Sequence, residues 1–201
     1  MNNLLRECFG TLFKFLLNQI HSGALNERSA ITIMKKDKLM LVLRIVQCLS
    51  KHIDISMTTF RKIPYVLQCC EIDLGLKFQL GVNGPYTLEL DEFHDFINIE
   101  KHGNVKIISV TNDFDISKYT FTEKEMYMTN AVYKLFRRFV NSVEAEMFTM
   151  LLERKISGID KPENLSRYDS DKFSKKKVKL LKLLEDFEQI VFPYLDNSWF
   201  S

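Results

Sequence analysis

The stretch from residue 80 to residue 90, Leu-Gly-Val-Asn-Gly-Pro-Tyr-Thr-Leu-Glu-Leu, restricts the fold of this chain more than any other segment. Its glycines and proline interrupt regular structure, so a strand over residues 76–82 should end in a tight turn at residues 83–85. Thr87 is placed to cap a helix that runs to about residue 102. The stretch therefore predicts a strand, a turn and a helix in succession.

Apolar residues recur at helical spacing in the part of the chain before this stretch. The helices that they predict span residues 4–23, 37–51 and 58–70. Pro64 lies inside the third helix, where it should kink it or mark its true start. Residues 22–35 look like a connector, in which residues 30–34 could form a short strand.

Alternating apolar residues after the stretch predict a two-stranded hairpin from residues 105–110 and 116–121. Three helices followed by a hairpin are typical of a winged helix-turn-helix. Thr122 and Glu125 then have capping-box spacing and should open either one long helix or two helices. A loop over residues 157–171 and a last helix to residue 192 complete the prediction.

We therefore expect a mainly α chain with a small β-hairpin, an α+β fold. Residues 1–122 would form a winged-helix-like unit, and residues 123–201 would form a helical unit that could share its core. With 201 residues, 46% of them hydrophobic, the chain is large enough to bury such a core.

Charge and cysteine usage narrow the class of protein. The net charge is only +2, from 28 basic and 26 acidic residues, which gives no general support for nucleic-acid binding. The four cysteines lack Cys-x-x-Cys spacing and fit reduced thiols in a cytoplasmic protein. The apolar run near the N-terminus carries Arg6, Glu7 and Lys14, so we expect neither a signal peptide nor a membrane anchor.

The helix predicted immediately before the hairpin is rich in carboxylates. In a winged helix this element reads the major groove, and duplex DNA carries about one negative charge per 1.7 Å of axis. Repulsion therefore argues against DNA reading here and favours contact with a partner protein. The candidate partner-binding residues in this segment are Glu89, Asp91, Glu92 and Asp95.

Basic residues concentrate in two other segments, one in each of the last predicted helices. They either form solvated helix faces, neutralised by nearby acids, or contact phosphates or an acidic partner. If the two segments meet in the fold, they form one basic patch. The candidate nucleic-acid-binding residues are Lys134, Arg137, Arg138, Lys172, Lys175, Lys176, Lys177 and Lys179.

No motif in the chain indicates catalysis. It has no Gly-x-Ser-x-Gly, no P-loop and no Gly-x-Gly-x-x-Gly, and His94 and His102 are too far apart for a helical zinc pair. A divergent metal-dependent nuclease is a further hypothesis, and its site would consist of Asp113 and Asp115 with Glu123 and Lys124. Acids at a hairpin tip more commonly form turns, however. We expect a protein that is not an enzyme and binds no cofactor or metal.

Three segments carry a resemblance to a known family. They are Thr59-Phe60-Arg61-Lys62-Ile63-Pro64-Tyr65-Val66-Leu67, Gly84-Pro85-Tyr86-Thr87-Leu88-Glu89-Leu90 and Gly103-Asn104-Val105. Over residues 56–123 the chain resembles the YwgA-like and Panacea (SocA-like) winged-helix proteins. The resemblance implies an antitoxin-type or adaptor protein, with structural turn residues at Gly84, Pro85 and Tyr86.

The C-terminal segment is aromatic and should dock either on its own domain or on another chain. Its candidate partner-binding residues are Tyr194, Trp199 and Phe200. Together these features predict a non-enzymatic regulatory subunit that binds a larger protein, such as an antitoxin or the small subunit of a bacterial defence complex with an ATPase or nuclease. Two alternatives remain: a nucleic-acid-binding protein using the lysine cluster, and the divergent nuclease.

Overall fold

The structure, a computed structural model, describes residues 27–103, 105–111, 119–158 and 171–195. Contacts between Cα atoms divide the chain into two units, Met1–Leu39 and Met40–Ser201, and the boundary falls inside helix α2 (Glu27–Ser50). The predicted helix over residues 4–23 lies outside the described residues. The predicted division at residue 122 remains a prediction.

Helix α2 corrects the expected connector over residues 22–35. From residue 27 onward this segment is helical, and residue 37, where the second helix was expected to begin, lies within the helix. Residues 30–34 contain β-branched residues, which favour a strand, but propensity is a weak prior. Neither glycine nor proline interrupts the sequence from Glu27 to Ser50, so the helix continues through it.

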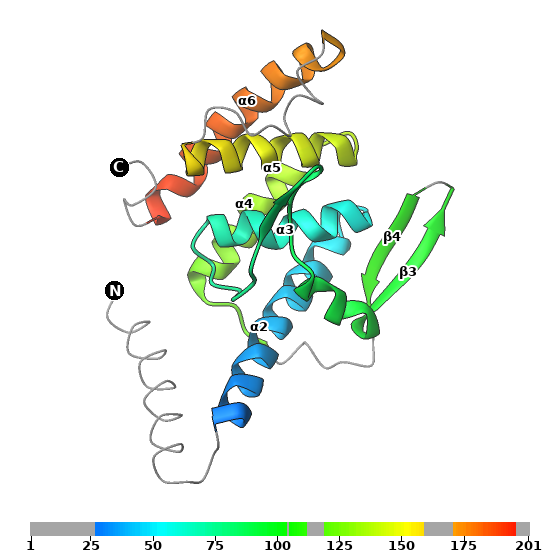
Figure 1. Cartoon of the computed structure of the whole chain (residues 1–201), viewed down its shortest axis with the longest axis vertical. Coiled ribbons are helices and arrows are strands. Elements are labelled where there is room, and N and C mark those ends of the chain that lie inside the picture. The colour runs from blue at the N-terminus through cyan, green and yellow to red at the C-terminus, as the bar shows by residue number, and fades with distance from the viewer. Residues whose placement is uncertain (1–26, 104, 112–118, 159–170, 196–201) are drawn as a thin grey trace. The chain divides into compact units, whose positions relative to one another are not determined.

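The remaining described elements all belong to the second unit (Figure 1). In chain order they are α3 (Met57–Cys69), β1 (Gln79–Gly81), β2 (Gly84–Tyr86), the 3₁₀ helix η1 (Glu89–Phe96), β3 (Ile97–His102), β4 (Val105–Val110), α4 (Glu123–Phe136), α5 (Ser142–Ser157), α6 (Asp171–Val191) and the 3₁₀ helix η4 (Phe192–Tyr194). The sheets are the antiparallel pairs β1–β2 and β3–β4. The expectation of a mainly helical α+β chain is thus confirmed.

Helix α3 forms the centre of this unit. Ser56 caps it by accepting a hydrogen bond from the backbone N–H of Thr59 at 3.1 Å, and Pro64 lies within the helix, as expected. The helix packs against α4, α5 and β2. Because it is covered on several sides, the run from Lys62 to Leu67 is buried throughout.

Helices α4, α5 and α6 form the other half of the same unit. The capping box is confirmed: Thr122 accepts from the N–H of Glu125 at 3.2 Å, and Glu125 accepts from the N–H of Thr122 at 2.7 Å. Asn141 caps α5, so this region forms two helices and not one. Helix α5 packs on α3 and β2, and also on α6, so it lies between them (Figure 1).

The predicted helix over residues 87–102 is wrong. Only Glu89–Phe96 is helical, as the 3₁₀ helix η1, and the chain then enters β3, which pairs with β4. Its apolar side chains nevertheless point inward as expected, since Leu90, Phe93 and Ile97 are all buried. The hairpin is therefore formed by residues 97–110, one strand earlier than predicted.

The strand pattern explains this shift. Ile97 and Ile99 alternate with polar residues and lie opposite Val110 and Ile108, so β-branched pairs face each other across the two strands. Only positions 103 and 104 connect them, and Gly103 supplies the positive φ, +61°, that a short turn requires. Residues 119–121 form no strand, and residues 116–118 lie outside the described residues.

The segment that should have been a turn is itself a small hairpin. Strand β1 pairs with β2 in the register Gln79 to Tyr86 and Gly81 to Gly84, so Val82 and Asn83 form the turn. Gly84, Pro85 and Tyr86 constitute β2. The element that follows is η1, so the α-helix expected to read DNA before the hairpin does not form.

None of the helices in the described ranges is long and apolar enough to cross a lipid bilayer.

Candidate functional site

Hairpin β1–β2 is attached to the core by a buried lysine. The ammonium group of Lys62, on α3, donates hydrogen bonds to the carbonyl oxygens of Asn83 at 2.6 Å and Pro85 at 2.7 Å. Lys62 is only 4% exposed. Burial lowers the pKa of Lys62 from 10.5 to about 8, with Arg61 acting in the same direction and Glu146 opposing it.

Gly84 lets the hairpin approach the helices closely. Its φ is +88°, a conformation that suits glycine. A Cβ there would lie 3.0 Å from Cγ of Met150, 3.2 Å from Nζ of Lys62 and 3.3 Å from Oγ1 of Thr149. There is accordingly no space beside the ammonium group for a substrate, and the position of Lys62 fits a structural tether better than a catalytic amine.

Four apolar side chains within and just after the hairpin are exposed to solvent. Val82, in the turn, is 62% exposed, and Leu88, two residues after β2, is 71% exposed. Leu80 and Tyr86 are exposed as well, and the hydroxyl of Tyr86 donates to Gln79 at 3.1 Å. We call these four side chains, Leu80, Val82, Tyr86 and Leu88, the hairpin patch.

The backbone of β1 has hydrogen-bonding groups on the side away from β2 that are unpaired within the described residues. Leu80 lies opposite Pro85 in the ladder. Proline has no N–H, so the two residues cannot exchange hydrogen bonds, and the backbone N–H and C=O of Leu80 point away from β2. Such an edge can pair with an extended segment of another chain.

A second polar cluster joins α3 to α5 nearby. The hydroxyl of Tyr65 donates a hydrogen bond to the carboxylate of Glu153. Burial raises the pKa of Tyr65 above its usual value and raises the pKa of the Cys69 thiol to about 12. A thiol with so high a pKa is a poor nucleophile.

The acidic segment lies on η1, and part of it has partners within the chain. Glu89 accepts from the backbone N–H of Lys77 at 2.7 Å, and Asp91 forms a salt bridge with Arg61 at 3.4 Å. Asp95 is exposed, and the side chain of Glu92 lies outside the described residues. His94 lies 3.9 Å from Asp91. Arg61 lies near the start of α3 and Cys69 at its end, and the helix rises about 1.5 Å per residue. Asp91, which pairs with Arg61, therefore lies far from the Cys69 thiol.

The two basic segments come together. Nζ of Lys179, on α6, lies 3.5 Å from the carbonyl oxygen of Arg138, just after α4. Arg138 also forms a salt bridge with Asp186 at 3.0 Å, and Lys179 forms one with Glu144 at 2.8 Å. Lys172 is in the first turn of α6, with its side chain outside the described residues.

The aromatic C-terminal segment docks in part on its own unit. The ring of Tyr194 stacks on that of Tyr127, with 3.8 Å between ring centroids, and the hydroxyl of Tyr127 donates to the carbonyl of Ile190 at 3.0 Å. Tyr194 therefore docks on its own chain. Trp199 and Phe200 lie outside the described residues.

Groups that could hold a metal were also considered. No cluster of three or more histidine, cysteine, aspartate or glutamate side chains with suitable geometry occurs in the described ranges. Asp113 and Asp115, of the nuclease hypothesis, lie outside those ranges. Lys124 of that hypothesis forms a salt bridge with Glu71 at 2.9 Å.

Lys62 was not identified from the sequence. The signal that could have indicated its burial is the apolar run Ile63–Leu67 that begins directly after it on α3. A lysine buried beside such a run must find acceptors, and the carbonyls of a neighbouring turn provide them.

No protein-family model matches the chain, and no curated protein matches it significantly.

Proposed function

We propose that this chain is a non-enzymatic accessory subunit that binds and regulates a larger protein through the hairpin patch. The observation that carries the proposal is the pairing of an exposed apolar hairpin with a rigid, buried attachment. Single exposed apolar side chains are common, but Val82 and Leu88, 62% and 71% exposed, lie with Leu80 and Tyr86 within nine residues.

The attachment through Lys62 matters because rigid surfaces bind more tightly. A loop that must be ordered on binding loses part of the interaction energy to conformational entropy. Two hydrogen bonds from Lys62 and the close contact of Gly84 with Met150 hold the hairpin before any partner arrives. The free backbone edge at Leu80 adds hydrogen-bonding groups that a partner strand can use.

The acidic residues on η1 provide a charged margin to this surface. Asp91 and Asp95 are exposed and follow Leu88 closely in the chain. Charged margins around an apolar centre favour correct orientation of a partner more than they raise affinity. A partner with basic residues beside an apolar strand would fit this arrangement.

This proposal does not require a recognition helix. It includes a winged-helix-like protein, as the resemblance to the YwgA-like and Panacea proteins implies, and a cytoplasmic location. Within it, an antitoxin-type protein or the small subunit of a defence complex with an ATPase or nuclease is the class that we favour. The nuclease alternative has no specific observation in its favour.

The test compares partners captured by three forms of the tagged full-length chain in its native host. These are the wild type, the V82D/L88D variant and the V140D variant, which adds a charge at a residue 79% exposed on another part of the unit. The proposal expects proteins enriched by the wild type and by V140D that V82D/L88D loses. Identical proteins with all three forms, or robust turnover of nucleic acid or nucleotides by the purified chain, would overturn it.

A further inference from the structure

The second surface of interest is formed where α4 ends and α6 begins. Lys134, Arg137 and Arg138 come from α4 and the residues after it, and Lys175, Lys179 and Lys182 come from the first half of α6. These six residues are the α4–α6 basic face. Lys179 contacts Arg138 directly, so two segments about 40 residues apart in the chain form one surface.

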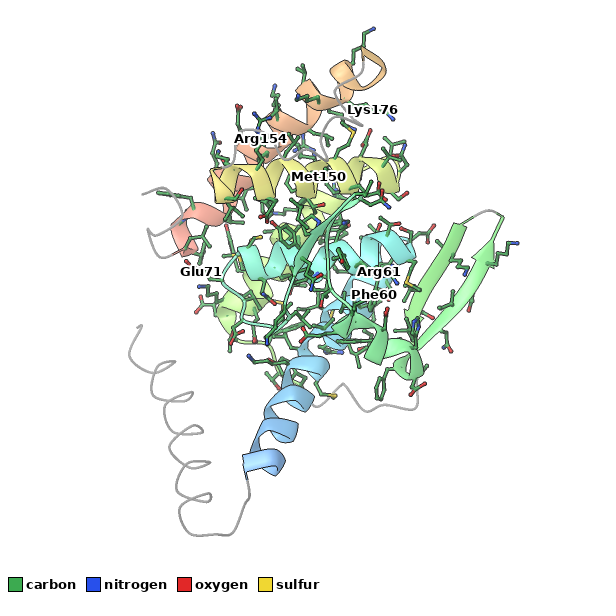
Figure 2. All side chains as sticks on the ribbon, viewed as in Figure 1. Phe60, Arg61, Glu71, Met150, Arg154 and Lys176 are labelled. Carbon is green, nitrogen blue, oxygen red and sulfur yellow. The ribbon has the colours of Figure 1, made fainter. Side chains whose placement is uncertain are left out.

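Further cations extend this face around α6. Arg154 and Lys155, in the last turn of α5, and Lys177 of α6 surround a hollow of about 320 Å³. Figure 2 shows the side chains of Arg154 and Lys176 on the α5 and α6 side of the unit, while Phe60 and Arg61 lie on α3. Basic groups therefore lie on both flanks of α6.

Three acids near this face, Glu144, Asp186 and Glu188, already pair with basic residues. Glu144 is 4% exposed, and although burial opposes its charged form, hydrogen bonds from Lys179 and from the N–H of Val140 lower its pKa. Asp186 pairs with Arg138, and Glu188 pairs with Lys155. Lys134, Lys175 and Lys182 are exposed and form no salt bridge within the described residues.

The lysines do not stabilise the helix that carries them. Lys175 and Lys179 are four residues apart on α6, and Lys179 and Lys182 are three apart. Like charges at these spacings each destabilise a helix by about 0.2–0.5 kcal/mol. A ligand that carries negative charge would relieve this repulsion.

The charge of the surface favours a phosphate backbone. A groove of about 440 Å³ runs between α4 and α6, and Lys134, Arg137 and Arg138 line it together with apolar residues. The cationic groups along its margins can neutralise phosphates, whose charges repeat at short intervals along a nucleic-acid backbone. An acidic protein segment is the alternative occupant that the test distinguishes.

We propose that the α4–α6 basic face binds the phosphodiester backbone of nucleic acids, without reading base sequence. This activity goes beyond the proposed function, and it uses none of the residues of the hairpin patch. The repulsion argued from the sequence does not bear on it, because the carboxylates in question lie on η1 and the expected recognition helix is absent.

The test measures binding of the full-length chain to a fluorescent 20-nucleotide single strand and to the matching duplex between 50 and 200 mM salt. The variant is K134E/K175E/K182E, and the control is K51E/K77E/K101E, which changes net charge equally at exposed lysines outside the face. Both variants should keep the wild-type urea midpoint. Poly-glutamate serves as the probe for an acidic protein segment.

We expect affinity that falls steeply with salt and a loss of at least tenfold in the face variant, with less than a twofold change in the control. The slope of log K against log salt should fall by about 0.7–0.9 for each phosphate contact that is removed. The relative affinity for single strand and duplex then identifies which backbone is preferred. V82D/L88D should bind nucleic acid normally, which separates this inference from the proposed function.

Three results would overturn the inference. They are no binding at 50 mM salt, an equal loss in the face variant and the control, and tighter binding of poly-glutamate than of either nucleic acid. The last result would assign the face to an acidic protein instead.

Discussion

The ammonium nitrogen of Lys62 lies 2.7 Å from the carbonyl oxygen of Pro85, and this contact joins the central helix α3 to hairpin β1–β2. A charged group is costly to bury unless acceptors surround it. Here the acceptors are backbone carbonyls of the hairpin itself, so the orientation of the hairpin and the burial of Lys62 depend on each other.

Replacing Lys62 with Met should destabilise the protein by about 2 kcal/mol. The variant removes the donor to the buried carbonyl of Pro85, and an unsatisfied buried acceptor costs about 1–3 kcal/mol. Urea unfolding measures the change. Lys77→Met, at an exposed lysine, is the control and should stay within about 0.5 kcal/mol of wild type. A Lys62→Met variant as stable as this control would contradict the tether.

The contribution of Lys62 to stability should rise with pH between 8 and 9. The pKa of Lys62 is about 8 in the folded chain against 10.5 when solvated, so in this window the unfolded state binds more protons at this group and a rise in pH favours folding. The gain should be about 1 kcal/mol. It is measured as the change, between the two pH values, in the difference in unfolding free energy between the wild type and Lys62→Met.

The comparison with Lys62→Met is needed because two buried cysteines act in the opposite direction. Burial raises the pKa of the Cys69 thiol to about 12 and also raises the pKa of the Cys70 thiol, so over this range the unfolded state loses protons from both. A difference between wild type and Lys62→Met that does not grow between pH 8 and 9 would show that Lys62 is not desolvated as described.

Gly84→Ala should cost more stability than Gly103→Ala. Both glycines have positive φ, +88° and +61°, so both variants incur backbone strain of about 1–2 kcal/mol. Only at Gly84 would the new Cβ meet neighbours, with Met150 at 3.0 Å, whereas nothing lies within 4 Å at Gly103. Crowding should add about 1 kcal/mol or more. Equal losses in urea unfolding would contradict the close approach of hairpin and helix.

Thr122→Ala should destabilise α4 by about 1 kcal/mol because it removes the cap that accepts from Glu125 at 3.2 Å. Thr122→Ser keeps the hydroxyl and should retain most of the stability. Thermal unfolding of the two variants provides the comparison. Equal losses for alanine and serine would mean that the methyl group, and not the cap, is responsible.

Local patterns predicted the helices best. The spacing of Thr122 and Glu125 identifies where α4 begins, because capping depends only on neighbouring residues. Whether one helix or two follow was left open, and the cap at Asn141 shows that there are two. The hairpin was misplaced because Leu90, Phe93 and Ile97 fit a helical stripe as well as the alternating pattern that starts at Ile97. Only pairing with residues 105–110, a contact between strands, decides between them.

The candidate surfaces were predictable to different degrees. All residues of the α4–α6 basic face except Lys182 were identified from the clustering of basic residues in the sequence, but their meeting at Arg138 and Lys179 depends on how α4 and α6 pack. The attachment by Lys62 joins residues more than 20 positions apart through a buried ammonium group. The apolar run beside Lys62 can indicate that the lysine is buried, but no local pattern shows which carbonyls accept from it. Stacking of Tyr194 on Tyr127 likewise depends on tertiary packing.

The most direct test of the protein-binding account is photo-crosslinking in the native host. A benzophenone amino acid would be placed at position 82, in the hairpin patch, and separately at position 140, which is similarly exposed. The account predicts a discrete crosslinked protein from position 82, absent from position 140 and abolished when Leu80 and Leu88 are changed to Asp. No adduct at position 82, or the same adducts from both positions, would contradict it.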